Sequence, residues 1–161
     1  MQNAKDSFYM ALRTRLAAIN PQRTTLVRGA VRPGVLVEDA EAPQAQSPDG
    51  VFVLRWGALA VNQELDTTLT AMECEIVYQS CGAQSYGGLD RGRALTEMDK
   101  EAVAMLQPLT APKANYTGAA VTTMLTQIFW DAPAFGPIIV QRDRLSRSVK
   151  VKVYSYEEQG E

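Results

Sequence analysis

The glycine-rich stretch at residues 86–101, YGGLDRGRALTEMDKE, has the spacing that most resembles a phosphate-binding motif. Gly87 and Gly92 match the G-x-x-x-x-G pattern, but arginine and alanine follow where the working motif needs lysine and serine or threonine. Alanine cannot hold a magnesium ion, and the carboxylate of Asp90 would repel phosphate oxygens. We therefore interpret the stretch as a helix entrance, with glycines in the turn and Asp90 as the N-cap.

The remaining candidates for chemistry are limited, because the chain contains no histidine and only two cysteines, Cys74 and Cys81. The Ser–His and Cys–His nucleophile pairs are therefore excluded, and one chain cannot complete the usual structural zinc sets. Carboxylates and lysines can still serve as acids and bases, so an enzyme is not excluded on this ground. We expect no catalytic residue, no metal and no nucleotide cofactor.

Two other groups of residues are weighed as sites. Glu73 and Glu75 form a carboxylate pair on one strand face, but the outer face of a strand usually carries such charges. Trp56, Phe129 and Trp130 could stack a base or a sugar, yet aromatic residues in strands mostly belong to the core. Both groups are interpreted as structural.

Charge is distributed unevenly along the chain. A basic segment near the C-terminus contains Arg142, Arg144, Arg147, Lys150 and Lys152, with only Asp143 opposing it in that segment. The stretch from Glu38 to Asp49 contains four acids and no base. Both can be ordinary solvated surface, or they can meet between copies in a head-to-tail contact. The candidate self-association residues are Glu38, Asp39, Glu41, Arg142, Arg144 and Arg147.

Length and composition favour one globular domain spanning residues 1–161. Hydrophobic residues make up 46% and charged residues 21%, and no run of about 18 apolar residues predicts a membrane span. The N-terminus lacks the apolar core of a signal peptide, so we expect a cytoplasmic product. The net charge of −2 gives no electrostatic footprint for nucleic acid on the chain as a whole.

The first third of the chain predicts one helix and several short strands. A helix at 6–19, capped by Asp6 or Ser7, places four apolar residues on one face: Phe8, Leu12, Leu16 and Ile19. Short β segments follow at 24–28 and 35–38. The polar, proline-containing loop 39–50 is predicted to be mobile.

Two longer strands and a second helix form the middle of the chain. In 51–61, Phe52, Leu54 and Trp56 share one face. In 69–80 the inward residues are Met72, Cys74, Ile76 and Tyr78. A helix at 91–107, ended by Pro108, has an apolar stripe of Leu95, Met98, Ala102, Val103, Met105 and Leu106.

The last third predicts further strands. Residues 109–127 are compatible with a loop, a short strand or a turn of helix, and are a possible insertion. Strands are expected at QIFW, at IIVQRDRL and at SVKVKVYSY. Because helices and strands do not alternate regularly, the fold class is α+β, a mainly antiparallel sheet with two principal helices packed on one face.

With this order of elements, the chain resembles the tail terminator, or tail-completion, proteins of long-tailed bacteriophages and prophages. The resemblance covers nearly the whole chain: the opening helix FYMALRTRLAAI, the segments VLVED and VFVLRW, the strand MECEIVYQ, the helix RALTEMDKEAVAMLQP and the closing VKVKVYSY. None of these is a diagnostic motif. The long segment PLTAPKANYTGAAVTTMLTQ departs from the pattern.

The resemblance implies a non-enzymatic structural protein. Such proteins form hexameric rings that end the tail tube and join it to the head, so the implied partners are further copies, a tail-tube protein and a head–tail connector protein. DNA would pass through the ring without sequence-specific binding, and the protein would occur in the bacterial cytoplasm during assembly and then in the virion tail. The alternatives are another connector or tail-tube subunit, or a small cytoplasmic ligand-binding domain or enzyme.

Overall fold

The computed structural model describes residues 1–39, 48–64 and 67–158 of the chain, and consists of two α-helices and many strands. In chain order the elements are α1 (Gln2–Ile19), β1 (Thr24–Val27), β2 (Ala30–Pro33), β3 (Val35–Val37), β4 (Phe52–Glu64), β5 (Thr67–Ser80), the short 3₁₀ helix η1 (Gln84–Tyr86), α2 (Arg91–Met105), β6 (Thr110–Asn115), β7 (Thr122–Trp130), β8 (Ala134–Phe135), β9 (Ile139–Val140) and β10 (Leu145–Tyr156). Most of the loop predicted to be mobile, including Glu41, lies outside the described residues.

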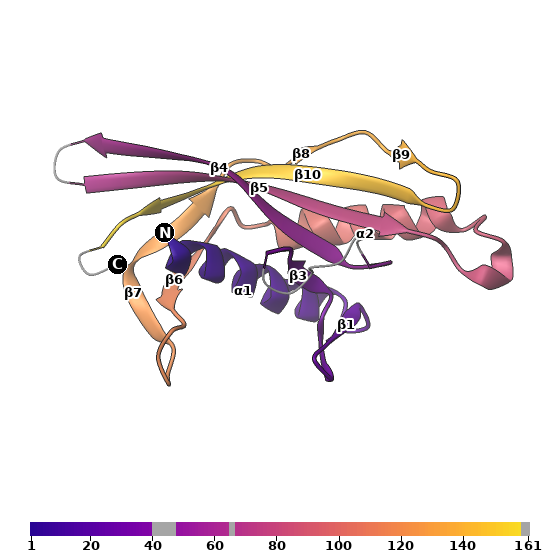
Figure 1. Ribbon diagram of the computed structural model, residues 1–161, viewed down its shortest axis with the longest axis horizontal. Helices are drawn as coiled ribbons and strands as arrows, with labels where there is room; N and C mark the ends of the chain where they lie inside the picture. Colours follow the sequence, from indigo (N-terminus) through magenta and orange to yellow (C-terminus); the bar gives the residue numbers. More distant parts are fainter. Residues whose placement is uncertain (40–47, 65–66, 159–161) are drawn as a thin grey trace.

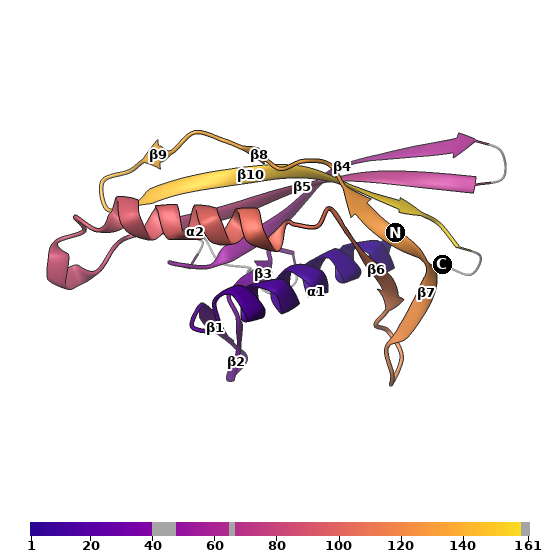
Figure 2. The same cartoon turned by 180° about the vertical axis from the view of Figure 1, so that it is seen from behind.

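The main sheet has the strand order β3-β4-β5-β10-β7-β6, and β8 and β9 also pair with β10. Its described pairs are antiparallel except for β3 with β4. Both helices lie on the same side of this curled sheet (Figures 1 and 2). The predicted α+β class, with a mainly antiparallel sheet and two helices on one face, is therefore confirmed.

Helix α1 packs its apolar face into the core as predicted. Phe8, Leu12 and Leu16 are completely buried. Ile19 is exposed, contrary to the prediction, because it is the last residue of the helix and extends past the core. The Phe8 ring contacts Trp130 edge-on, with ring centroids 5.0 Å apart, and so joins α1 to β7.

The start of α1 differs from the prediction. The helix begins at Gln2 with Met1 at the N-cap, so Asp6 and Ser7 lie inside it and neither is a cap. Ser7 is buried, and its hydroxyl accepts a 2.9 Å hydrogen bond from the Ala114 N–H of β6. A residue read from sequence as a cap thus joins α1 to an edge strand.

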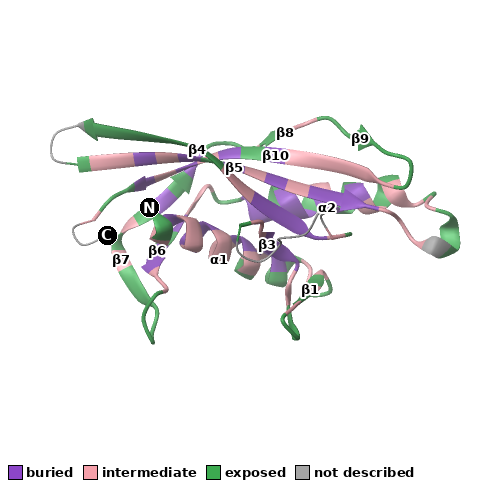
Figure 3. Ribbon diagram, viewed as in Figure 1, coloured by how far each residue is buried: buried purple, intermediate pink, exposed green. Residues whose placement is uncertain are grey.

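Strands β4, β5 and β10 supply the sheet side of the core. Four alternating residues of β5 are buried as predicted: Met72, Cys74, Ile76 and Tyr78. They pair in register with β10, whose buried valines are Val149, Val151 and Val153. Figure 3 shows that buried residues gather where the helices meet the sheet, whereas the outer half of β4 is exposed.

Helix α2 ends at Met105, two residues before the expected Gln107. Leu95, Met98, Ala102, Met105 and Leu106 are buried as predicted. Val103 is exposed, contrary to the prediction, because the buried stripe passes through Ala102 and Met105, and Val103 points to the other side. Glu101 is buried instead.

Residues 109–127 form most of a β-hairpin, β6 with β7, that packs against α1.

The prediction of one continuous strand over IIVQRDRL, residues 138–145, is wrong for the second half of that segment. Only Ile139 and Val140 belong to β9, because Gln141 turns the chain and donates a 2.9 Å hydrogen bond to the Arg144 carbonyl before β10 begins. The predicted strand SVKVKVYSY is confirmed within β10.

Candidate self-association surface

The acidic candidates that the structure describes lie where β3 leaves the sheet. Glu38 directly follows β3, and its carboxylate pairs with the Arg55 guanidinium of β4 at 3.0 Å. Both side chains of this pair are about half exposed, and the next residue, Asp39, is exposed. The candidates Glu38 and Asp39 therefore stand at the outer edge of β4.

The basic candidates lie in the turn from β9 to β10 and at the start of β10. Arg144 holds the Asp143 carboxylate through two hydrogen bonds, of 3.0 and 2.6 Å. These bonds lower the pKa of Asp143 and raise the pKa of Arg144. Arg142 is exposed on the same turn, and its carbonyl oxygen accepts a hydrogen bond from Arg91.

The third arginine, Arg147, faces α2. Its Nε lies 3.2 Å from a carboxylate oxygen of Asp99, and its Nη1 donates to the Gly136 carbonyl oxygen. Asp99 also accepts a hydrogen bond from the buried Tyr78 hydroxyl. Burial, followed by the bond to Asp99, raises the pKa of Tyr78. Arg147 therefore holds α2 against the sheet in this chain, and is used within the fold.

The lysines of the basic segment are opposed by carboxylates that are distant in sequence. Lys150 is in register with Glu75 of β5, and Lys152 is in register with Glu73. Glu75 is in turn in register with Arg55 of β4. The description of the segment as opposed only by Asp143 is therefore corrected, because the sheet register places opposite charges beside both lysines. Glu73 and Glu75 face outward, as interpreted from sequence.

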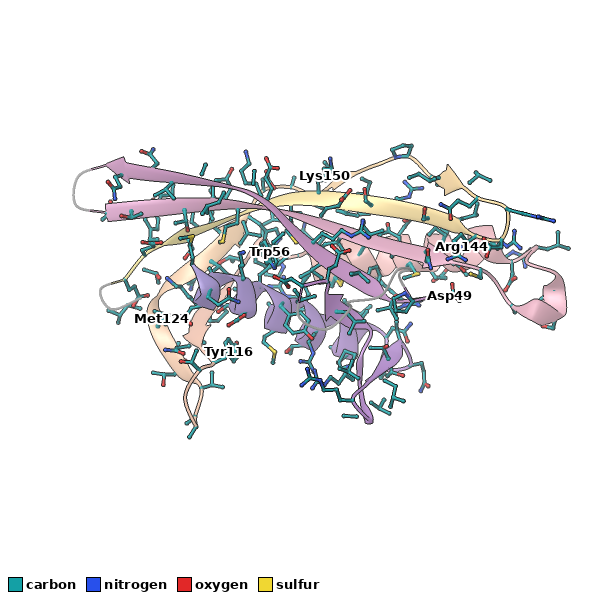
Figure 4. All side chains as sticks on the ribbon, in the orientation of Figure 1. Asp49, Trp56, Tyr116, Met124, Arg144 and Lys150 are labelled. Carbon is teal, nitrogen blue, oxygen red and sulfur yellow. The ribbon has the colours of Figure 1, made fainter. Side chains whose placement is uncertain are left out.

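Asp49, near the end of the predicted loop, lies close to the turn between β9 and β10 of its own chain. The Asp49 carboxylate accepts a 2.7 Å hydrogen bond from the Cys81 N–H and contributes to the raised pKa of Arg144. Figure 4 shows Asp49 and Arg144 at the same end of the molecule. Of the described candidates, the exposed Asp39 and Arg142 therefore remain available for a contact between copies, whereas Glu38 is already paired with Arg55.

A groove of about 500 Å³ crosses β4, β5 and β10 next to the β7–β8 loop. Its charged lining residues are Arg55, Glu73, Glu75, Asp131, Lys150 and Lys152. Asp131 accepts a 2.6 Å hydrogen bond from the Lys152 N–H, which fixes one wall. Cys74 borders the groove, but burial raises the pKa of its thiol and so disfavours the reactive thiolate. The groove offers paired charges and no activated nucleophile among these residues.

The glycine-rich stretch is a helix entrance, as interpreted. Gly87 and Gly88 have φ of 58° and 79°, which permits the turn before α2. The side chain of Arg91 lies against Gly88 and donates to the carbonyl oxygens of Cys81 and Arg142. Asp90 occupies the N-cap position but makes no side-chain cap. Its carboxylate accepts hydrogen bonds from the Ala83 N–H, and the capping prediction is corrected accordingly.

Two buried polar networks were missed from sequence. Glu101 of α2 accepts hydrogen bonds from the Arg23 guanidinium and, at 2.6 Å, from the Asn20 amide. Arg15 of α1 donates to three carbonyl oxygens that follow or end α2. Glu101 lies on the same buried face of α2 as Met98 and Ala102. This position in the sequence could have indicated that the Glu101 carboxylate is buried and therefore needs a partner.

Two structural findings concern bound groups and membranes. In the described part of the chain, no cluster of three or more cysteine, aspartate or glutamate side chains is placed to hold a metal ion. Neither of the helices in that part has both the length and the apolar character that crossing a membrane requires.

No protein-family model matches the chain, and a search of curated proteins finds no match to it.

Proposed function

We propose that this protein is a non-enzymatic structural subunit of a bacteriophage or prophage tail, which assembles into a ring that ends the tail tube and joins it to the head. The proposal begins from the resemblance of the sequence to tail terminator proteins, which rests on the order of an opening helix, paired long strands, a second helix and a closing strand.

The observation that carries the proposal is the exposed outer half of β4, which forms an arm with the outer half of β5. Every β4 residue from Gly57 to Val61 is exposed, including Leu59 and Val61. The arm extends beyond both helices (Figures 1 and 2). Apolar strand surface left outside the core is typical of an assembly interface. A subunit of a ring needs such surfaces.

In this proposal the ring contains six copies, as in the resembling proteins. One face binds the last ring of tail-tube protein, the other binds a connector protein, and DNA passes through the bore with no sequence-specific contact. The protein acts in the bacterial cytoplasm during assembly and remains in the virion tail. The exposed candidates Asp39 and Arg142, with the half-exposed Glu38 beside Asp39, are proposed as part of the contact between neighbouring copies.

The experiment is a capping assay with a tail-tube protein of a long-tailed phage or prophage, taken from the genome that encodes this chain. Purified protein is added to growing tubes, and tube length and end density are measured by electron microscopy. We expect tube growth to stop and one extra ring to be visible at one end. Unchanged tube growth with no bound ring would contradict the tail-terminator function. Incorporation along the whole tube would instead indicate the alternative, a tail-tube subunit.

A further inference from the structure

The edges of the main sheet are protected unequally. An exposed strand edge is a template for pairing with another chain, and proteins usually block it with proline, charge or a covering element. The β6 edge is blocked in all three ways. Pro112 removes one N–H, the Ser7 hydroxyl bonds the Ala114 backbone, and the charged Arg15 binds the Thr110 carbonyl oxygen.

The adjoining strand β7 is also protected where it extends beyond its pairing with β10. The carboxylate of Glu158 accepts hydrogen bonds from the N–H groups of Leu125 and Thr126, at 3.2 and 2.7 Å. A charged side chain therefore occupies the positions that an incoming strand would use. This side of the sheet is closed to strand addition.

The outer edge of β4 has none of these protections. Strand β3 covers it only through the pairs from Val35–Phe52 to Val37–Leu54, and in the described part of the chain no strand continues along it. The five residues Gly57–Val61, GALAV, include neither a charge nor a proline, and all are exposed. We call this segment the β4 edge. It therefore carries neither of the residue types, charged or proline, that usually block strand addition.

A second open edge lies on the other part of the molecule. Strand β9 pairs with β10 on one side, and Ile138, Ile139 and Val140 are exposed. We call Ile138–Val140 the β9 edge. It is uncharged like the β4 edge, and Figure 1 shows β9 and the outer end of β4 at opposite ends of the sheet. One copy can therefore use both edges at once.

The charges flanking the two edges are opposite in sign. Glu38 and Asp39 stand where β3 stops covering β4, and Glu38 contacts Arg55 just before the β4 edge. Arg142 is two residues beyond Val140, on an exposed turn. Two β4 edges carry flanks of the same acidic sign, whereas a β4 edge and a β9 edge carry flanks of opposite sign, so charge complementarity favours the mixed pairing.

We infer that the β4 edge of one copy pairs with the β9 edge of a second copy, so that the sheet continues from subunit to subunit. Because the two edges differ, the contact is head to tail and repeats by rotation into a closed ring or an open filament. The inference rests on the self-assembly in the proposed function, and requires neither the tail tube nor a ring of six.

The test uses one blocked edge at a time. Val61→Lys blocks the β4 edge and Val140→Lys blocks the β9 edge. The two native side chains are 51% and 76% exposed, so both variants should fold. Ala60→Lys and Ile139→Lys repeat the test at neighbouring exposed positions. Leu125→Lys is the control, because Leu125 is 96% exposed and belongs to neither edge. Near-ultraviolet circular dichroism confirms folding.

Sedimentation velocity is measured for each protein up to its highest soluble concentration. We expect wild type and Leu125→Lys to assemble, and each edge variant to self-associate at least about tenfold more weakly. A mixture of Val61→Lys with Val140→Lys should form a one-to-one dimer and nothing larger, because a single intact pair of edges remains.

Several results would overturn the inference. They are normal assembly of either folded edge variant, a mixture that gives no dimer, or wild type that stays monomeric throughout the concentration series. Normal assembly of Val140→Lys with loss in Val61→Lys would point to pairing between two β4 edges. These outcomes are separate from the capping assay, since rings that cap tubes through another interface keep the proposed function and remove this contact.

Discussion

The Arg15 guanidinium in α1 donates a 2.7 Å hydrogen bond to the carbonyl oxygen of Thr110, the first residue of β6. It also donates to the carbonyl oxygens of Met105 and Pro108, at 3.1 and 2.8 Å. Its charged plane lies over the Trp130 ring. One side chain therefore joins α1 to the C-terminal end of α2, where a cation is favoured by the helix dipole, and to the hairpin that follows.

Replacing Arg15 by methionine should destabilise the fold. The change keeps much of the apolar stem but removes three charge-assisted hydrogen bonds to backbone carbonyls. We expect a loss of at least about 1.5 kcal/mol in the free energy of unfolding, measured by urea denaturation. Arg93→Met, at an exposed position of α2, is the control and should stay within about 0.5 kcal/mol. Equal effects would contradict the linking role.

Shortening Leu16 or Met105 to alanine should be costly, because both are completely buried, one on each helix. Each change leaves a cavity between the helices and the sheet, and should lower the free energy of unfolding by about 2–5 kcal/mol. Leu125→Ala is the control, since the exposed side chain should contribute under about 0.5 kcal/mol. Losses below that value at both buried sites would contradict the assignment of these helix faces to the core.

The predictable part of this fold is the part governed by local periodicity. Phe8, Leu12 and Leu16 recur at helical spacing, and Met72, Cys74 and Ile76 recur at strand spacing, so their burial follows from sequence. Of the hairpin β6–β7, the sequence predicts only the QIFW end of β7 as a strand. Pro112 and the polar residues of the turn weaken the pattern elsewhere, where pairing with β10 and cover by α1 support the strands.

The candidate surface depends on contacts between residues distant in sequence. Lys150 and Lys152 look unopposed in the chain, and only the register of β5 with β10 places Glu75 and Glu73 beside them. The openness of the β4 edge likewise depends on where β3 stops pairing, which no local pattern specifies. The sequence alone shows that residues 38–49 are acidic and that residues 142–152 are basic. It does not show that these segments lie beside the β4 edge and the β9 edge.

Glu101→Gln should destabilise the fold strongly. The buried Glu101 carboxylate binds the largely buried Arg23 guanidinium, so neutralising it leaves that cation without its counter-charge. Breaking one side of such a pair typically costs about 3–5 kcal/mol. The matched control is Glu97→Gln, which breaks the exposed pair with Lys100 and should cost less than about 1 kcal/mol. Chemical denaturation of both variants gives the comparison, and similar small losses would contradict a structural role for Glu101.

Thr126→Val should raise the pKa of Glu158. The Thr126 hydroxyl, its N–H and the Leu125 N–H donate to the Glu158 carboxylate and hold its pKa below the ordinary value of 4.5. The stability this contact provides is therefore present above pH 4.5 and is lost as the pH falls through the lowered pKa. Carbon-detected NMR titration measures the shift, with Thr122→Val as the control. An unchanged pKa in Thr126→Val would show that the hydroxyl has no effect.

Changing Arg142 and Arg144 together to glutamate should weaken self-association and reverse its response to salt. In the inferred contact this turn would bring positive charge toward a neighbour's Glu38 and Asp39, so salt should weaken wild-type assembly. Each exposed pair contributes under ~1 kcal/mol, and the effect should therefore be partial. Sedimentation at low and high salt measures it. The control is Arg93→Glu with Lys100→Glu on α2, which makes the same change in net charge at exposed positions. If the two double variants behave alike, the β9–β10 turn does not flank the interface, whereas the lysine variants of the two edges still decide the strand pairing itself.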